Sequence, residues 1–318
     1  MVCPNRPRSE AVRANQAKRM LAVTVDDLPG AIPATPTANG ELRKLARYNE
    51  AIPAILKAHH APAIGFVNEK KLNVAGERDA RVALLQRWID AGFELGNHTY
   101  SHANFNQVSL LEMEDETVRG EVITRSLMKS AGKSERYFRY PYLFTGPTSE
   151  VKEAFETFLK SRGYKNAPVT VDNADYMFND ILCEAAVRKD TKLAEQTKLE
   201  YLQFAQTQFD YFEEGSRKLF GREIPQVFLM HDNEINTETL DQLLGLLEKR
   251  GYQFVSLDEA LADPAYATPD RFVGTAGISW IDRWRVSFGQ KADYEHDPDP
   301  PEWVMKRFRE IRKAAANQ

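Results

Sequence analysis

The sequence predicts an α/β fold built on a parallel sheet, either open or closed into a barrel. Short apolar runs alternate with helical segments about seven times, as strands joined by helical crossovers do. The runs are nearly free of charge, which is typical of strands covered on both faces. The chain of 318 residues is long enough for two average domains or for one large barrel.

The seven expected strands are apolar runs that end at polar residues or at turn-forming Gly and Pro. They cover residues 21–25, 62–67, 93–96, 137–140, 165–171, 226–230 and 252–255. The first of them, Leu-Ala-Val-Thr-Val, ends abruptly in Asp26 and Asp27, so two carboxylates are expected at its carboxyl end.

The expected helices lie between these strands. They cover residues 41–59, 78–91, 109–131, 149–162, 237–250 and 301–315, with one or two more between 180 and 220. Pro53 should kink or divide the first helix, because proline lacks the N–H that the helix needs. Ser109 and Glu112 have the spacing of a capping box, which predicts where the third helix begins.

These elements predict a catalytic barrel at 20–263, with a helical insertion at about 180–222 before the sixth strand. A polar tail at 1–19 precedes it, and an extension at 264–318 is expected to pack on it. The tail lacks the apolar core of a signal peptide. Two cysteines, Cys3 and Cys183, show neither a metal-binding spacing nor a sign of pairing.

The composition excludes several classes of protein. Hydrophobic residues make up 42% and charged residues 28%, so the chain is neither disordered nor a disulfide-dense mini-protein. The net charge of −4 is not the positive charge that is typical of a nucleic-acid binder. No apolar stretch reaches the roughly 18 residues of a transmembrane helix.

Polar side chains gather at the carboxyl ends of the expected strands, where parallel α/β proteins bind their ligands. These residues are Asp26, Asp27, His98, His102, Arg139, Tyr142, Asp172, Asp175, His231 and Asp232. The spacing of His98 and His102 predicts two imidazoles on one side of a helical turn. Two histidines and a carboxylate, with positions left for water, form a catalytic site for a divalent metal.

Five short motifs resemble, in order, those of the polysaccharide deacetylase family (carbohydrate esterase family 4, the nodulation-factor deacetylase homology domain). They are Thr24-Val-Asp-Asp27 for Thr-Phe-Asp-Asp, His98-Thr-Tyr-Ser-His102 for His-(Ser/Thr)-x-x-His, Arg139-Tyr-Pro-Tyr142 for Arg-x-Pro-Tyr, Asp175-Tyr176 for Asp-Trp, and Leu229-Met-His231 for Leu-x-His. Family members are distorted (β/α) barrels, usually with seven strands, so the resemblance implies this form of the fold.

The resemblance also implies a metal site and two proton-transfer groups. Asp27, His98 and His102 would hold one divalent metal, zinc in the first place, with cobalt, nickel or manganese as alternatives. Asp26 would be the general base acting on the water that the metal activates. His231 would be the general acid that protonates the leaving amine.

The remaining motif residues would support these groups. Arg139 would orient Asp26, and Asp175 would in turn hold Arg139, a role for which Asp172 competes. The backbone N–H of Tyr142 would help to hold the oxyanion. Leu229 and Tyr176, the latter in place of the usual Trp, would line the acyl pocket.

The implied function is removal of N-acetyl groups from a chitin- or peptidoglycan-like polymer or oligosaccharide. Three alternatives stay open: an O-acetyl esterase acting on a glycan such as xylan, a small-amide hydrolase of the allantoinase-like branch, and a non-catalytic glycan-binding protein. The expected partner is a glycan or an acetylated small molecule. The resemblance favours a periplasmic or secreted location, and the oligomeric state stays open.

The insertion and the C-terminal extension are both long enough to reach the mouth of the barrel and narrow it. A pocket for a chain end or a small glycan is therefore expected rather than a long open groove.

Overall fold

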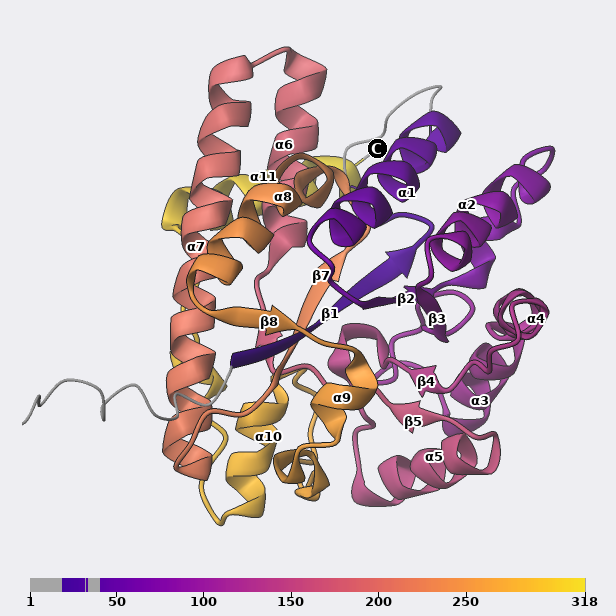
Figure 1. Cartoon of the computed structure of the whole chain (residues 1–318), viewed down its shortest axis with the longest axis vertical. Coiled ribbons are helices and arrows are strands. Elements are labelled where there is room, and N and C mark those ends of the chain that lie inside the picture. The colour runs from indigo at the N-terminus through magenta and orange to yellow at the C-terminus, as the bar shows by residue number, and fades with distance from the viewer. Residues whose placement is uncertain (1–18, 32, 34–40, 318) are drawn as a thin grey trace, which may run out of the picture.

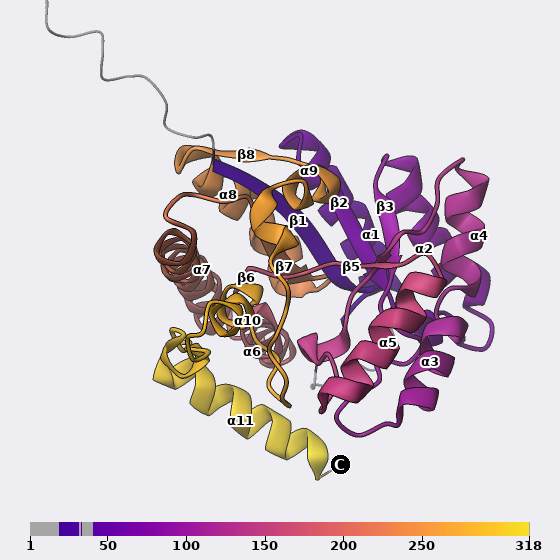
Figure 2. The same cartoon turned by 90° about the horizontal axis from the view of Figure 1, so that it is seen from below.

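The computed structural model describes residues 19–31, 33 and 41–317 (Figure 1). Parallel strands form a curled sheet at its centre, and helices surround that sheet (Figures 1 and 2). The predicted distorted (β/α) barrel is confirmed. The predicted tail, including Cys3, lies outside the described residues apart from Arg19, and the domain boundaries stay predictions.

The strands follow the order β5-β4-β3-β2-β1-β7-β6, and β8 pairs with β1. Their bounds are β1 Arg19–Leu28, β2 Ala63–Val67, β3 Glu94–Asn97, β4 Tyr137–Phe138, β5 Lys165–Asn166, β6 Val171–Asp172, β7 Gln226–His231 and β8 Tyr252–Phe254. β1 is central, because β2 and β7 flank it, and its register places Asp26 opposite His231. The sheet thus brings two of the expected catalytic residues together.

The strand predicted at 165–171 is wrong as a single element. Its start, β5, pairs with β4, whereas its end, β6, pairs with β7 at the other edge of the sheet. Between them, Ala167 N–H donates to Phe138 and Thr170 N–H donates to Val227. Residues 167–171 are buried, but the segment bridges the two edges of the curled sheet, so its ends have different neighbours.

The helices are α1 Glu41–Ala58, α2 Arg78–Asp90, α3 Leu110–Arg119, α4 Val122–Ser130, α5 Ser149–Ser161, α6 Asp175–Arg188, α7 Thr191–Phe220, α8 Glu234–Lys249, α9 Leu257–Leu261, α10 Trp280–Ser287 and α11 Glu302–Ala316. Short 3₁₀ turns are η1 Glu69–Leu72, η2 Pro141–Leu143, η3 Pro264–Ala267 and η4 Tyr294–His296. α1 is not divided at Pro53. Within the described residues, no helix is long and apolar enough to cross a membrane.

The helix predicted at 109–131 begins as expected, with the capping box of Ser109 and Glu112, but it breaks into α3 and α4. Gly120 lies at the break, where an added Cβ would be 2.7 Å from the backbone of Thr99. The Glu116 carbonyl accepts the N–H groups of both Tyr100 and Gly120. The break therefore makes room for the loop that carries the two histidines and bonds to it.

The region predicted as an insertion forms two helices, α6 and α7, and α6 starts earlier than expected, at Asp175. After β8 the chain returns to this pair, where α10 packs against α7 and α11 packs along α6 (Figure 2). Of the C-terminal extension, α11 thus lies beside the carboxyl-end face of the barrel.

Candidate active site

Two consecutive carboxylates, Asp26 and Asp27, lie near the end of β1 and line one cavity. Successive side chains of a regular strand point to opposite faces, so this needs an irregular backbone. Asp27 has a φ of 73°, and the register of β1 on β2 shifts between Val25 and Leu28. This irregularity turns both carboxylates to the same side.

Asp26 is held by Arg139, which is fully buried. The guanidinium donates to Asp26 Oδ2 at 3.2 Å, to Thr24 Oγ1 at 2.9 Å and to the Ala167 carbonyl at 2.9 Å. This is the contact that the motif resemblance implied. Burial raises the pKa of Asp26 to about 6, although the charge of Arg139 opposes the rise.

Asp27, His98 and His102 offer ligand atoms that all lie within 4.8 Å of one another. His98 Nδ1 is 2.8 Å from the Arg139 carbonyl, which can only accept, so Nδ1 carries the proton and Nε2 keeps a lone pair. Burial lowers the pKa of His98 well below its usual range, so its ring is neutral, as a metal ligand must be.

The acidic member of the set also fits a cation. Within the described part of the chain, Asp27 Oδ1 is buried and receives no hydrogen bond. The Lys71 ammonium lies 3.0 Å from it and donates to the Asp27 carbonyl at 2.9 Å. An oxygen and two imidazole nitrogens suit zinc and related divalent metals.

The helical turn expected at His98 and His102 is wrong, although the rings do meet, with centroids 4.9 Å apart. A loop carries them, with left-handed φ values of 64° at Thr99 and 62° at His102. The Asn97 side chain accepts the Thr99 N–H at 2.8 Å, which turns the chain at the end of β3. The spacing is therefore satisfied by turn geometry rather than by helical periodicity.

His231, at the end of β7, is held by Asp175 at the start of α6. Its Nδ1 lies 2.6 Å from Asp175 Oδ1, and its backbone N–H donates to Asp175 Oδ2 at 2.8 Å. Burial lowers the pKa of His231, but the charge and hydrogen bond of Asp175, together with the charges of Asp27 and Asp26, outweigh this and raise it to about 10. The free face of the ring therefore presents a proton to the cavity.

The expected pairing of Asp175 with Arg139 is not observed, because the Asp175 carboxylate is committed to His231 and to Asn233 and Asn236. Of the two candidates, Asp172 is the acid whose charge acts on Arg139. Burial lowers the pKa of Arg139, and the charge of Asp172 opposes this effect. The sequence could not separate these two acids, because both follow the same predicted strand.

The acyl-pocket candidates line the same cavity, which has a volume of about 730 Å³. Tyr142, half exposed in a left-handed turn, places its ring 4.4 Å from that of His102. The Tyr176 ring is 6.3 Å from that of His231, edge-on, and Leu229 is buried beside it. Eight of the ten residues to which the resemblance assigns a role line this cavity, and the other two, Arg139 and Asp175, hold Asp26 and His231 from outside it.

Sequence reasoning missed three residues here: Lys71, and Phe308 and Arg312 of α11, which line the cavity. Phe308 and Arg312 are four residues apart on a predicted helix and so share a face. That spacing was visible, but the face that meets the barrel depends on how the C-terminal extension returns to α6.

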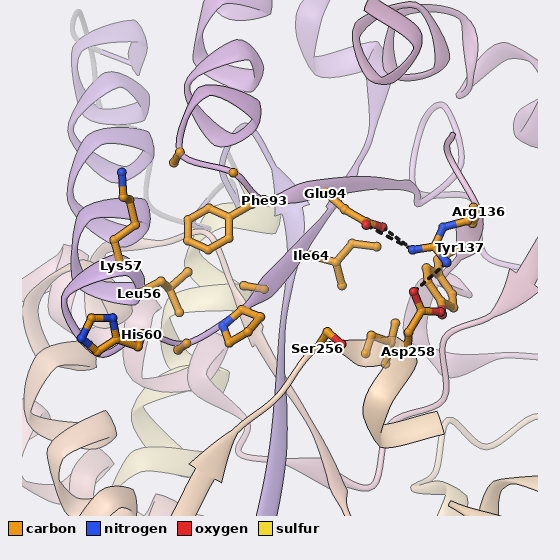
Figure 3. A pocket seen from close by; sticks show the side chains of 16 residues that line it. Leu56, Lys57, His60, Ile64, Phe93, Glu94, Arg136, Tyr137, Ser256 and Asp258 are labelled. Carbon is orange, nitrogen blue, oxygen red and sulfur yellow. Dashed lines mark hydrogen bonds and ion pairs between the residues drawn. The ribbon is translucent and has the colours of Figure 1, made fainter. Parts of the chain in front are cut away.

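A second cavity, of about 490 Å³, lies at the opposite, amino ends of β2, β3 and β4 (Figure 3). Three of its charged groups, Arg136, Glu94 and Asp258, are paired with one another. Arg136 contacts Glu94 at 2.9 Å and Asp258 at 2.6 Å, and Tyr137 also donates to Asp258 (Figure 3). The groups suited to hydrolysis therefore lie at the carboxyl ends of the strands.

Comparison with known proteins places this geometry in a family. Residues 13–165 match the polysaccharide deacetylase family. The "Uncharacterized 30.6 kDa protein in fumA 3'region" of Geobacillus stearothermophilus is 20% identical over 228 residues, which cover 70% of this chain and 69% of that protein.

Two solved structures are similar to this chain, and the first of them shows the same fold. A mutant of a carbohydrate esterase family 4 (CE4) pseudoenzyme from Bacillus anthracis is 21% identical, with a TM-score of 0.50 over 77% of this chain and 67% of its own. A variant of the peptidoglycan deacetylase PdaC of Bacillus subtilis is 18% identical, with a TM-score of 0.48 over 79% and 95%.

A pseudoenzyme on this fold means that the activity of this chain must be argued from its own residues. The family match nevertheless confirms the resemblance, over a segment that contains the first three of the five motifs. It also confirms the expected enzyme class, a hydrolase acting on carbon–nitrogen bonds other than peptide bonds. Over residues 13–165, just under half of its length, this chain is similar to the polysaccharide deacetylase family.

Proposed function

We propose that the protein is a metal-dependent hydrolase that removes N-acetyl groups from an amino-sugar polymer or oligosaccharide. One observation carries the proposal: a three-ligand metal set, an oriented carboxylate and a proton-bearing histidine all border one cavity. Loss of any of these groups would instead favour a non-catalytic glycan-binding protein.

Asp27, His98 and His102 would hold the metal, zinc in the first place. When bound there, a divalent metal supplies a Lewis acid and lowers the pKa of water. Asp26 accepts the proton of the attacking water, and a pKa of about 6 suits a base that works near neutral pH. Arg139 keeps the Asp26 carboxylate in place for that transfer.

His231 donates its proton to the nitrogen as the carbon–nitrogen bond breaks, so acetate and a neutral amine leave. Asp175 keeps that proton on the ring. The backbone N–H of Tyr142 is the proposed hydrogen-bond donor to the oxyanion. Leu229 and Tyr176 are proposed to line the pocket that holds the acetyl group.

The same groups would cleave an O-acetyl ester. The strongly held proton on His231 favours the amide, because an amine is a poor leaving group until it is protonated. The intact metal set argues against the metal-independent, small-amide alternative.

Metal content and acetate release from N-acetylglucosamine oligomers, measured before and after chelation, test the proposal. We expect about one metal per chain and acetate release only while the metal is bound. Full activity after chelation would refute the metal role. If the protein binds metal and releases no acetate from these oligomers but cleaves acetyl esters, the result would favour the O-acetyl esterase instead.

A further inference from the structure

The C-terminal helix α11 supplies one wall of the catalytic cavity. It packs along α6 and contributes Phe308 and Arg312 to the lining (Figure 2). The Phe308 ring lies 5.5 Å from that of Tyr176, which in turn contacts His231. Arg312 lies one helical turn beyond Phe308, with its guanidinium carbon 5.1 Å from that ring.

From this position we propose that Arg312 binds a carboxylate of the substrate. The preferred glycan would then carry an acidic sugar next to the N-acetylated one. The inference rests on the proposed deacetylase function and adds a substrate class to it. A guanidinium suits this role because its planar N–H groups match the two oxygens of a carboxylate.

Charge distribution in the cavity supports the proposal. Among the described lining residues, Arg312 is the one lysine or arginine. Its side chain is 48% exposed, whereas the Arg139 side chain is fully buried and that of Lys71 is 15% exposed. An anionic group at the mouth therefore meets Arg312 before any other cation of the site.

Three acids of the site are paired with cations other than Arg312, whereas Asp180, which also lines the cavity, offsets part of the Arg312 charge. Asp26 is paired with Arg139, Asp27 with Lys71, and Asp175 with His231. The charge of Arg312 also reaches the Tyr142 and Tyr176 hydroxyls, whose pKa values it lowers against the stronger, raising effect of burial. The charge of Arg312 is thus felt in the part of the cavity that the two tyrosines line.

Arg312 already has one protein partner, Asp180, which accepts its Nε–H at 2.8 Å. That bond uses one of the five N–H groups and fixes the plane of the guanidinium. A purely structural role, as a latch for α11, is the competing explanation. The helix has such a latch elsewhere, since Arg307 donates to both oxygens of Glu184 at 2.7 and 2.8 Å.

This second ion pair provides a matched control. Arg307→Gln loosens α11 outside the cavity, whereas Arg312→Gln removes the charge inside it. The probe is a short hyaluronan oligosaccharide, in which N-acetylglucosamine alternates with glucuronic acid. Its methyl ester is the uncharged control, and a chitin oligomer of equal length is the neutral reference.

For the wild-type enzyme we expect a lower KM for the acidic oligomer than for its methyl ester. Arg312→Gln should raise the KM of the acidic oligomer about fivefold and leave the other two within about twofold, as loss of a half-exposed ion pair would. Arg312→Lys should keep part of the preference. Arg307→Gln should lower Tm without changing the KM ratio.

Three outcomes would decide against the inference or its basis. Acetate release without any preference for the acidic oligomer would overturn the role of Arg312 and leave the proposed function standing. An equal rise of all three KM values in both variants would make Arg312 a latch. No acetate from any oligomer would refute the proposed function, and calorimetric binding of the three oligomers to Asp26→Asn would still test Arg312.

Discussion

Replacing Asp175 by Asn tests the assignment of His231 as the general acid. Asp175 is fully buried, and its charge is what holds the proton on the ring. The substitution keeps the size of the side chain but removes that charge. We therefore expect the pKa of His231 to fall from about 10 towards its usual value, because burial lowers it and only the weaker effects of Asp27 and Asp26 still raise it.

The size of the effect follows from the two pKa values. At pH 8 a histidine with a pKa of about 10 is about 99% protonated, whereas one with a pKa of about 6.5 is about 3% protonated. The deacetylation rate at pH 8 should therefore fall by up to about 30-fold. The alkaline limb of the pH–rate profile should move down by up to about 3.5 pH units.

The assay compares pH–rate profiles on an N-acetylglucosamine oligomer and on p-nitrophenyl acetate, whose leaving group needs no proton. Asp172→Asn is the matched control, because it removes a partly exposed carboxylate from the same cavity without breaking the bond to His231. An unchanged alkaline limb, or equal losses on both substrates, would refute the general-acid role.

Three further predictions concern the other acids of the site. Asp27→Asn should leave less metal per chain after dialysis than the wild type retains, as measured by atomic emission, because the set loses its charged ligand. Asp26→Asn should retain the metal but lose turnover by about 100-fold or more; equal loss of both would make Asp26 a ligand. Burial raises the pKa of Asp232 to about 8, so the folded chain keeps a proton that the unfolded chain releases, and stability falls as pH rises from about 4 to 8. In metal-free protein, Asp232→Asn should raise the free energy of unfolding by on the order of 2 kcal/mol at pH 8 and by little at pH 4, which urea titration at both values would measure.

The fold was predictable because alternation of apolar runs and helices reports burial, and burial dictates a parallel sheet with crossovers. Errors arose where tertiary contacts override local pattern. The run at 165–171 looks like one strand, yet its ends bond to opposite edges of the sheet. Likewise the helix after Ser109 has an uninterrupted pattern, but the histidine loop occupies the space beside Gly120.

The identities of the site residues were predictable for a different reason. Motifs fix which residue types follow which strands, and parallel strands deliver their ends to one face. What a motif does not contain is the partner of each side chain. Asp175 and Asp172 follow the same predicted strand, and only the start of α6 at Asp175 decides that this residue meets His231. Similarly, Arg312 became visible only once α11 was placed beside α6.

The geometry of the site was hidden because it depends on strained backbone. Asp27, Thr99, His102 and Tyr142 all have positive φ values, between 55° and 73°, which non-glycine residues rarely adopt. Each costs of order 1 kcal/mol or more and persists only where surrounding contacts hold it. The Lys71 bond to the Asp27 carbonyl and the Asn97 bond to the Thr99 N–H are such contacts. Periodicity rules assume regular strands and helices, so they fail at the turns that aim the metal ligands, and the residues that hold those turns escape notice for the same reason.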